Sequence, residues 1–184
     1  MTHAHIIADG AGILDQGVLI TKPNDVYFSY LPSAHMFERA LVDGLIFIGF
    51  KVAFYSGQVV NVRDDLKNSK PTLFPCVPRV LNKFYGLIQA KIKETTGFKR
   101  KLLEKAIKAK LYNLEKNGKL THFLYDNLIF NKMKDIMGGK LRLIVCGGAP
   151  ISQEVLDFLK ICFCCPILEG YGLLSLILEF KRSN

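Results

Sequence analysis

Short apolar runs alternate along the chain with longer segments in which apolar residues recur at every third or fourth position. Residues 25–32 form a run rich in aromatic side chains that ends at a proline, and residues 51–56 form a similar run closed by Gly57. Such runs are typical of buried strands. Between them, residues 35–48 are expected to form a helix, because one apolar stripe recurs there at helical spacing. The stripe consists of Phe37, Leu41, Leu45 and Ile48.

A third short apolar run, residues 71–78, is interrupted by prolines at Pro71, Pro75 and Pro78. Proline lacks the backbone N–H that a strand ladder uses, so this run is predicted to be an edge strand or to end irregularly. The polar segment before it is interpreted as a short helix with Asp64 as its N-cap.

Beyond Pro78 the spacing of apolar residues becomes mainly helical, and it predicts three helices. A regular strand over residues 141–146 then runs into a glycine pair, and Ser152 is the expected N-cap of the next helix. This alternation predicts an α/β fold that forms part of a doubly wound, mostly parallel sheet. The three helices are expected over residues 81–92, 103–114 and 122–137.

The net charge of +9 is concentrated in one segment. Residues 79–119 contain twelve basic and three acidic residues, a net of +9, while the remaining residues carry thirteen of each sign. The two helices expected there form a basic insertion, and such helices most often present a solvated face. The alternative is a contact with anionic lipid or with the phosphates of coenzyme A. No nucleic-acid partner is expected, since the segment matches no recognised DNA- or RNA-binding module.

Cysteine usage and targeting signals further restrict the class of protein. The five cysteines show no disulfide framework, which favours free thiols in a reducing compartment. Cys162, Cys164 and Cys165 lack a second pair of zinc-ligand spacing, so they are interpreted as small buried residues at a helix end. No signal peptide is recognisable, and the most apolar run, residues 44–50, is far shorter than the roughly 20 residues that cross a bilayer. A soluble or peripherally membrane-associated protein is expected.

Two glycine-containing turns are candidates for binding a ligand. Residues 147–152 lie where a strand passes into a helix, a place where small residues let backbone donors approach a phosphate. Residues 169–172 place an aromatic side chain between two glycines, which would offer main-chain groups and a ring face to a purine. Either segment alone is also compatible with an ordinary turn. Neither has the spacing of a dinucleotide fingerprint or of a P-loop.

A third candidate follows the first strand. His35, Glu38 and Arg39 lie within five residues, where they would line a pocket or simply cap and cover the next helix. From the residues alone, a structural role for this histidine is favoured over a catalytic one.

Taken in order, these stretches resemble long-chain fatty acyl-CoA synthetases of the AMP-forming class. Residues 31–39 (LPSAHMFER) resemble that family's LPLAHMFER signature, and residues 64–82 are similar to its DDLK…PTVFPVVPRLLNR segment. Residues 138–152 are similar to its GG-x-(V/L)-R…GGAP-(L/V)-S element, and residues 161–166 to a stretch before its GYG-x-TE turn. Thr2 to Ile7 resemble the sequence that follows the family's phosphate loop.

The resemblance implies a reaction and a set of site residues. Members activate a long-chain fatty acid with ATP to acyl-AMP and then form acyl-CoA, using Mg²⁺ and coenzyme A. The resemblance places His35 near the reaction centre and also assigns it, with Tyr30 and Phe37, to the acyl channel. The residues implied for nucleotide binding are Gly148, Ala149, Pro150, Glu169, Gly170, Tyr171 and Gly172.

Departures from the family pattern lead us to expect a fragment of the large N-terminal domain. The phosphate loop would precede Thr2, and Ser175 stands where the Mg²⁺-binding glutamate is expected. Residues 1–173 are therefore interpreted as a partial AMP-binding domain, truncated at both ends, and residues 174–184 as an unmatched tail. We expect no acyl-CoA synthesis from this chain alone.

Two functional hypotheses follow from the resemblance. The leading one is a segment of an acyl-CoA synthetase that acts at the cytosolic face of the endoplasmic reticulum or of a mitochondrial membrane. The alternative is a non-catalytic protein that binds acyl chains, nucleotide or an anionic membrane surface.

Overall fold

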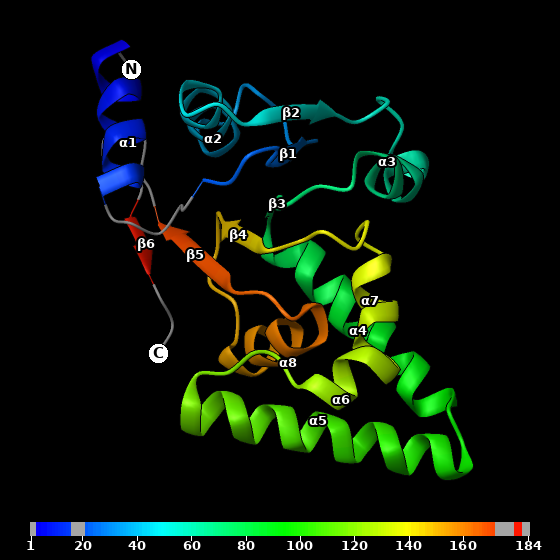
Figure 1. Cartoon of the computed structure of the whole chain (residues 1–184). Coiled ribbons are helices and arrows are strands. Elements are labelled where there is room, and N and C mark those ends of the chain that lie inside the picture. Colours follow the sequence, from blue (N-terminus) through cyan, green and yellow to red (C-terminus); the bar gives the residue numbers. More distant parts are fainter. Residues whose placement is uncertain (1–2, 16–20, 172–178, 182–184) are drawn as a thin grey trace.

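The computed structural model describes residues 3–15, 21–171 and 179–181 of the 184-residue chain (Figure 1). Its strands form one sheet in the order β2-β1-β3-β4-β5-β6. The first five strands in this order are parallel neighbours, and β6 runs antiparallel to β5. The strands are β1 (Val26–Ser29), β2 (Lys51–Phe54), β3 (Leu73–Cys76), β4 (Leu143–Gly147), β5 (Ile167–Tyr171) and β6 (Glu179–Lys181).

Helices connect and flank these strands. The α-helices are α1 (His3–Asp15), α2 (Met36–Phe47), α3 (Val62–Ser69), α4 (Pro78–Glu94), α5 (Gly97–Asn117), α6 (Phe123–Tyr125), α7 (Asn131–Asp135) and α8 (Gln153–Phe163). A 3₁₀ turn, η1 (Val59–Asn61), precedes α3, and a π-helical turn, η2 (Asp126–Phe130), joins α6 to α7. The single helix expected over residues 122–137 is therefore three short pieces.

Helices cover both faces of the sheet, as the doubly wound fold requires. Alternate strand residues point to opposite faces. Phe28, Phe74 and Ile144 belong to a core that also contains side chains of α4, α5 and α8. Tyr27, Leu73 and Val145 face the other way, into a core completed by α2. The predicted α/β fold with a mostly parallel sheet is confirmed.

Two local predictions were wrong. The prolines of β3 predicted either an edge strand or an irregular end, and the edge alternative was wrong, since β3 lies between β1 and β4. Its ladder with β1 comprises the single pair Tyr27↔Leu73, whereas four pairs join it to β4, so most of the pairing of the proline-containing strand lies on one side. Asp64 is not an N-cap: α3 begins at Val62 and Asp64 lies in its first turn.

The predicted Ser152 cap and the burial of Cys162 and Cys165 agree with the structure, whereas Cys164 is only half-buried. Ser152 accepts a hydrogen bond from the backbone N–H of Val155 and caps α8, and Gly118 ends α5 in the left-handed conformation. Cys162 and Cys165 are buried at the end of α8, and burial raises the pKa of the Cys165 thiol to about 12. These thiols are therefore protonated and behave as small apolar side chains.

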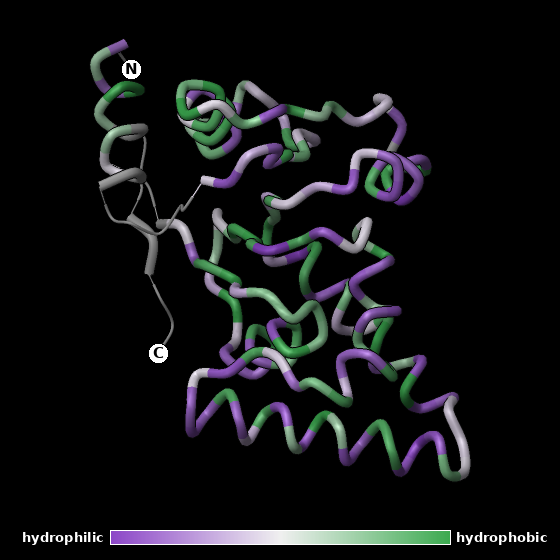
Figure 2. The backbone as a smooth tube through the Cα atoms, viewed as in Figure 1, coloured by the Kyte–Doolittle hydropathy of each residue, from purple (hydrophilic) through white to green (hydrophobic). Residues whose placement is uncertain are grey.

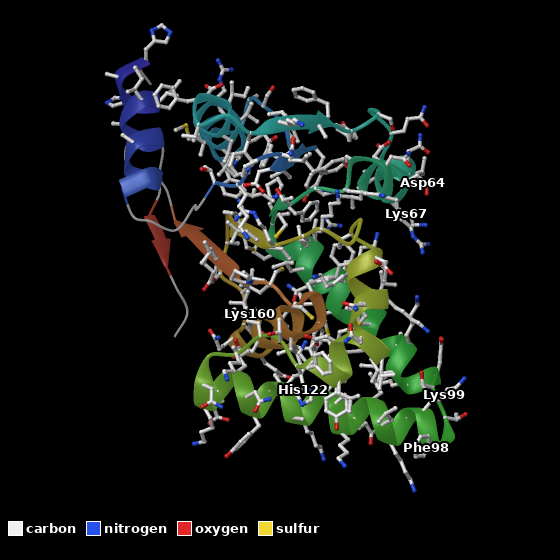
Figure 3. All side chains as sticks on the ribbon, viewed as in Figure 1. Asp64, Lys67, Phe98, Lys99, His122 and Lys160 are labelled. Atoms are coloured by element: carbon white, nitrogen blue, oxygen red, sulfur yellow. The ribbon has the colours of Figure 1, made fainter. Side chains whose placement is uncertain are left out.

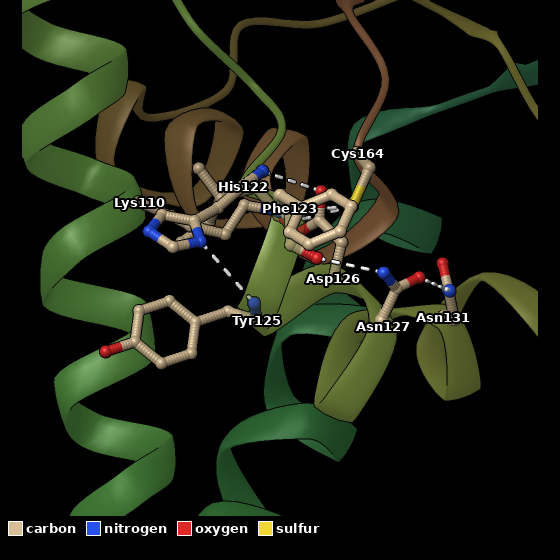
Figure 4. A network of polar contacts seen from close by, with 9 residues as sticks. Lys110, His122, Phe123, Tyr125, Asp126, Asn127, Asn131 and Cys164 are labelled. Atoms are coloured by element: carbon tan, nitrogen blue, oxygen red, sulfur yellow. Dashed lines mark hydrogen bonds and ion pairs between the residues drawn. The ribbon is translucent and has the colours of Figure 1, made fainter.

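The basic helix α5 lies along the base of the molecule, beneath α8 and α6 (Figure 1). Hydrophilic and hydrophobic positions alternate along its turns (Figure 2), as expected for a helix with one packed face. The packed face includes a lysine: Lys110 is 1% exposed. Its Nζ donates to Asp126 Oδ1 at 2.5 Å, to the carbonyl of Ile161 at 2.7 Å and to Cys164 Sγ at 3.1 Å (Figure 4).

Candidate functional site

The strand order places a topological switch point between β1 and β3. The chain passes from β1 through α2 to β2 on one side, and then returns to β3 on the other. The helix after β1 packs in one core and the helix after β3 packs in the opposite core. In open α/β sheets, ligands bind in the crevice that this arrangement creates at the carboxyl ends of the strands. The candidate site therefore lies beyond the ends of β1, β3 and β4.

Tyr30 lies directly after β1, at the switch point. Its ring stacks on Phe74 of β3 with centroids 5.2 Å apart and planes 6° apart, and on Phe28 at 5.9 Å. Burial raises the pKa of the Tyr30 hydroxyl, so it is protonated at neutral pH. That buried hydroxyl has no hydrogen-bond partner among the described residues. An unsatisfied buried hydroxyl is costly.

Glu38 anchors the first turn of α2 to β1. It is fully buried, and its two carboxylate oxygens accept hydrogen bonds of 2.6 Å from the hydroxyls of Tyr27 and Ser29. Burial raises the pKa of Glu38, although both hydrogen bonds act in the opposite direction. The sequence placed Glu38 on a pocket wall or a helix cap, but did not indicate that Tyr27 and Ser29 would hold it.

His35 caps α2. Its Nδ1 accepts a hydrogen bond from the backbone N–H of Phe37 at 3.2 Å, and the side chain is exposed at the carboxyl edge of the sheet. An accepting Nδ1 carries no proton, so the neutral imidazole in this geometry is protonated at Nε2. The capping role explains the local position of His35; its place near a reaction centre stays a prediction.

The Phe37 ring packs against Gly147 and so brings the motif at residues 31–39 into contact with the turn at residues 147–152. A Cβ atom placed on Gly147 would lie 2.8 Å from Cε2 and 3.0 Å from Cδ2 of the Phe37 ring. These distances are too short for any side chain, so the ring occupies the space that the glycine leaves open. The segment at residues 31–39 and the turn at residues 147–152 therefore meet at the same edge of the sheet.

The turn after β4 presents small, exposed residues. Gly148, Ala149 and Pro150 are all exposed, and Gly148 adopts a φ of +98°. α8 begins just beyond them, so its first backbone N–H groups lie close to the same edge. Exposed main chain beside a helix N-terminus suits the phosphate or base of a nucleotide, as the sequence led us to expect.

The second predicted nucleotide segment lies on the neighbouring strand. Glu169 pairs in register with Cys146, and Gly170 with Gly147, so this segment runs beside the turn after β4. Tyr171 is the last residue of β5. Gly172 and Ser175 lie outside the described residues.

The described residues contain no group of three or more histidine, cysteine, aspartate or glutamate side chains that could hold a metal ion. Mg²⁺ in nucleotide sites is usually bound through one or two carboxylates together with phosphate oxygens.

Comparison with known proteins identifies the family. A family model described as AMP-binding enzyme matches residues 1–173. The chain belongs to the AMP-binding enzyme family. It is 41% identical over 173 residues to long chain acyl-CoA synthetase 6, peroxisomal, of Arabidopsis thaliana, and 43% identical over 176 residues to long-chain-fatty-acid–CoA ligase 5 of Rattus norvegicus. Both matches cover 94% of this chain, but only 24% and 25% of the relatives.

Solved structures of other family members share the fold. The adenylation domain of a carboxylate reductase from Mycobacterium chelonae superposes with a TM-score of 0.64 at 20% identity, covering 88% of this chain and 22% of that one. The A domain of a carboxylic acid reductase from Segniliparus rugosus, solved with AMP and a co-purified carboxylic acid, gives 0.61 at 17% identity. It covers 97% of this chain and 26% of the other. This chain thus spans about a quarter of each of these proteins.

Proposed function

We propose that this chain contributes one wall of the active site of a long-chain fatty acyl-CoA synthetase. The proposal rests mainly on the sequence identity of about 40% to such enzymes over 94% of the chain. The contact between Phe37 and Gly147 supports it, because it joins two motifs of the resemblance at the edge where α/β folds bind ligands.

The proposed reaction has two steps. A carboxylate oxygen of the fatty acid attacks the α-phosphorus of ATP, forming acyl-AMP as pyrophosphate leaves. The thiol of coenzyme A then attacks the acyl carbonyl carbon, forming the thioester as AMP leaves. In the first step two anions must approach one another, so fixed donors and Mg²⁺ have to neutralise the charge that develops. The described residues include no cluster of three or more metal-ligand side chains, and the ion is part of the proposal for the complete enzyme.

The proposed roles of the site residues are those that the resemblance implies, and the exposure of the turn after β4 supports the nucleotide part. Gly148, Ala149 and Pro150 border the adenine, since they are exposed small residues beside the start of α8. Residues 169–172 complete the nucleotide pocket from the neighbouring strand. Tyr30 and Phe37 line the acyl channel, and His35 lies towards the reacting carboxylate.

Residues 1–173 form the adenylation part in this proposal, and residues 174–184 form a separate tail. β6 lies in that tail and pairs with β5, Glu169 opposite Lys181 and Tyr171 opposite Glu179. The tail therefore contacts the strand that carries the second nucleotide segment.

The proposed location is the cytosolic face of the endoplasmic reticulum or of a mitochondrial membrane. Two Arabidopsis relatives are named as peroxisomal, which makes a peroxisomal location a further alternative. Among the residues that the structure describes, no helix has both the length and the apolarity needed to cross a membrane.

A chimeric enzyme tests the proposal directly. Residues 1–173 would replace the aligned stretch of the rat ligase, and palmitate-dependent release of pyrophosphate and formation of palmitoyl-CoA would be measured. If this segment builds the same wall of the site, the chimera forms palmitoyl-CoA at a rate within about tenfold of the parent, a loss of about 1.4 kcal/mol of transition-state stabilisation. A chimera that folds and retains the parent's melting temperature, yet forms no acyl-adenylate, would overturn the proposal.

A matched pair of variants in the chimera tests the contact between the motifs. Gly147→Ala places a Cβ atom 2.8 Å from the Phe37 ring and should reduce the rate of adenylation. Phe37→Leu, added to it, removes the ring atoms that clash and should restore part of the rate. An effect of Gly147→Ala that the second substitution leaves unchanged would show that the contact does not shape the site.

A further inference from the structure

One surface of the molecule combines positive charge with exposed aromatic rings. On α5, six exposed residues follow one another at spacings of three or four and therefore share one helix face. Two of them are aromatic: Phe98 is 79% exposed and Tyr112 is 60% exposed. We call this face the α5 stripe; it consists of Phe98, Lys101, Lys105, Lys108, Tyr112 and Lys116.

The opposite face of α5 packs against the rest of the fold, so the α5 stripe faces outward. Ala106 and Lys110 are buried against the rest of the fold. The hydrogen bonds of Lys110 to Asp126 and to the carbonyl of Ile161 fix the rotation of the helix about its axis. Figure 3 shows Phe98 and Lys99 at one end of α5, projecting away from the body of the molecule. The α5 stripe is thus a fixed surface of the fold.

The lysines of the stripe lack the partners that neutralise neighbouring cations. Arg100 is paired with Glu104 at 2.8 Å and Lys110 with Asp126. Within the part of the chain that the structure describes, no ion pair is formed by Lys101, Lys105 or Lys108. The segment that carries the whole excess of positive charge therefore presents a row of uncompensated ammonium groups to its surroundings.

The exposed aromatics decide which anionic partner fits best. An exposed phenylalanine gains free energy on leaving water, and tyrosine suits a boundary that is apolar on one side and wet on the other. Lysine side chains extend along such a boundary while their charge stays among the headgroups. Basic helices with apolar side chains on one side lie in the plane of a membrane surface. At 21 residues, α5 would cover about 31 Å of that surface.

We infer that the α5 stripe docks on an anionic lipid surface, with Phe98 entering the headgroup boundary. The inference extends the membrane location in the proposed function by naming the surface that makes the contact. It is carried by the charge and exposure of α5 and not by the adenylation chemistry.

Vesicle binding by the full 184-residue chain tests the inference without fatty acid or nucleotide. Cosedimentation is compared for phosphatidylcholine vesicles with and without about 30% phosphatidylserine. We expect binding only to the anionic vesicles, and a loss of binding as ionic strength rises above roughly 0.15 M. Equal binding to neutral vesicles would overturn the electrostatic basis. Because adenylation is not assayed, a negative result here leaves the proposed function untouched.

Charge-matched variants locate the contact. The triple variant Lys101→Ala, Lys105→Ala and Lys108→Ala should bind anionic vesicles about 100-fold more weakly, since each lysine near such a surface contributes about 1 kcal/mol. The same three positions changed to Arg should retain binding. A control variant that removes the same charge elsewhere should bind within about threefold of the wild type. The control changes Lys67, Lys132 and Lys140 to Ala, all exposed and outside α5.

Two further results would overturn the inference. One is an equal loss of binding in the stripe and control variants, since it would indicate a general charge effect. The other is displacement of the protein from vesicles by a short DNA duplex at equal phosphate concentration, which would indicate a nucleic-acid surface. Phe98→Ala should weaken vesicle binding several-fold while leaving its salt dependence unchanged, because the ring contributes apolar and not electrostatic free energy.

Discussion

The buried lysine of α5 provides the sharpest test of how the basic helix is attached to the sheet domain. Lys110 is 1% exposed and donates to Asp126, to the carbonyl of Ile161 and to Cys164 (Figure 4). Its ammonium also lies 4.2 Å from the centre of the Phe130 ring. Lys110→Met keeps a similar volume and removes the charge. It leaves the Asp126 carboxylate, 15% exposed, without its cation.

The expected cost follows from this burial. Removal of one partner from a buried ion pair costs about 3–5 kcal/mol, because the remaining charge stays desolvated. Asp126→Asn should cost about 3 kcal/mol by the same reasoning. The asparagine oxygen still accepts from the backbone N–H of His122, so the cap of α6 is retained. The double variant leaves no isolated charge and should lose only about 2–3 kcal/mol, which gives a coupling free energy of about 3–6 kcal/mol.

Urea denaturation followed by circular dichroism measures each free energy of unfolding. The total stability of such a domain is about 5–15 kcal/mol, so the single variants are expected to unfold at clearly lower urea concentrations. Leu111→Met, on the same helix and half-buried, is the matched control and should cost less than about 1.5 kcal/mol. A coupling free energy below about 0.5 kcal/mol would refute the pair as the attachment of α5.

Two further predictions concern stability. The raised pKa of buried Glu38 means that the folded state holds its proton more tightly than the unfolded state. The contribution of Glu38 to stability should therefore be greatest below the usual value of 4.5 and fall as pH rises through the interval up to the folded pKa. Urea titrations over this range should show that the wild type loses this contribution and that Glu38→Gln does not. Gly138→Ala would place a Cβ atom 2.6 Å from the carbonyl oxygen of Leu66 at a φ of +86°, so it should cost more than Gly118→Ala, where φ is +63° and the space is open. Thermal denaturation compares the two variants, and equal melting temperatures would contradict the packing argument.

The parts of the fold that the sequence predicts well depend on local chemistry. The strand at residues 143–147, the turn after it and the Ser152 cap all follow from short-range patterns: an apolar run, a glycine pair and a hydroxyl three residues before a free N–H. α5 is equally local, since its apolar positions recur at helical spacing and Gly118 ends it. None of these features needs information from a distant segment.

The failures arise where tertiary contacts override local preference. α1 was not predicted because Asp9, Gly10 and Gly12 interrupt its apolar positions; in the structure α1 packs against α2. The prolines of β3 suggested an edge, yet the strand lies inside the sheet and makes most of its pairs with one neighbour.

Lys110 is another residue whose environment depends on tertiary contacts and could not be predicted from the local pattern of charge. In the sequence it is one of twelve basic residues in a segment that reads as a solvated surface. Its burial depends on Asp126 and on the end of α8, which lies about 50 residues further along the chain. The available signal was that Lys110 lies three residues after Ile107 and four before Leu114, a spacing that places it beside the apolar stripe of the predicted helix.

The two glycines of the pair after β4 have different surroundings in the structure, although the sequence motif treats them alike. As a motif, Gly147 and Gly148 predict one property, a backbone open to a ligand. In the structure the space above Gly147 is already filled by the Phe37 ring, so this glycine serves the packing of α2 against the sheet. Among the described residues, no atom outside the turn lies within 4 Å of a Cβ built on Gly148, and its φ of +98° favours glycine. Gly148 is therefore the glycine of the pair with open space above it among the described residues, and Gly147 is required so that the Phe37 ring of α2 can lie against the sheet.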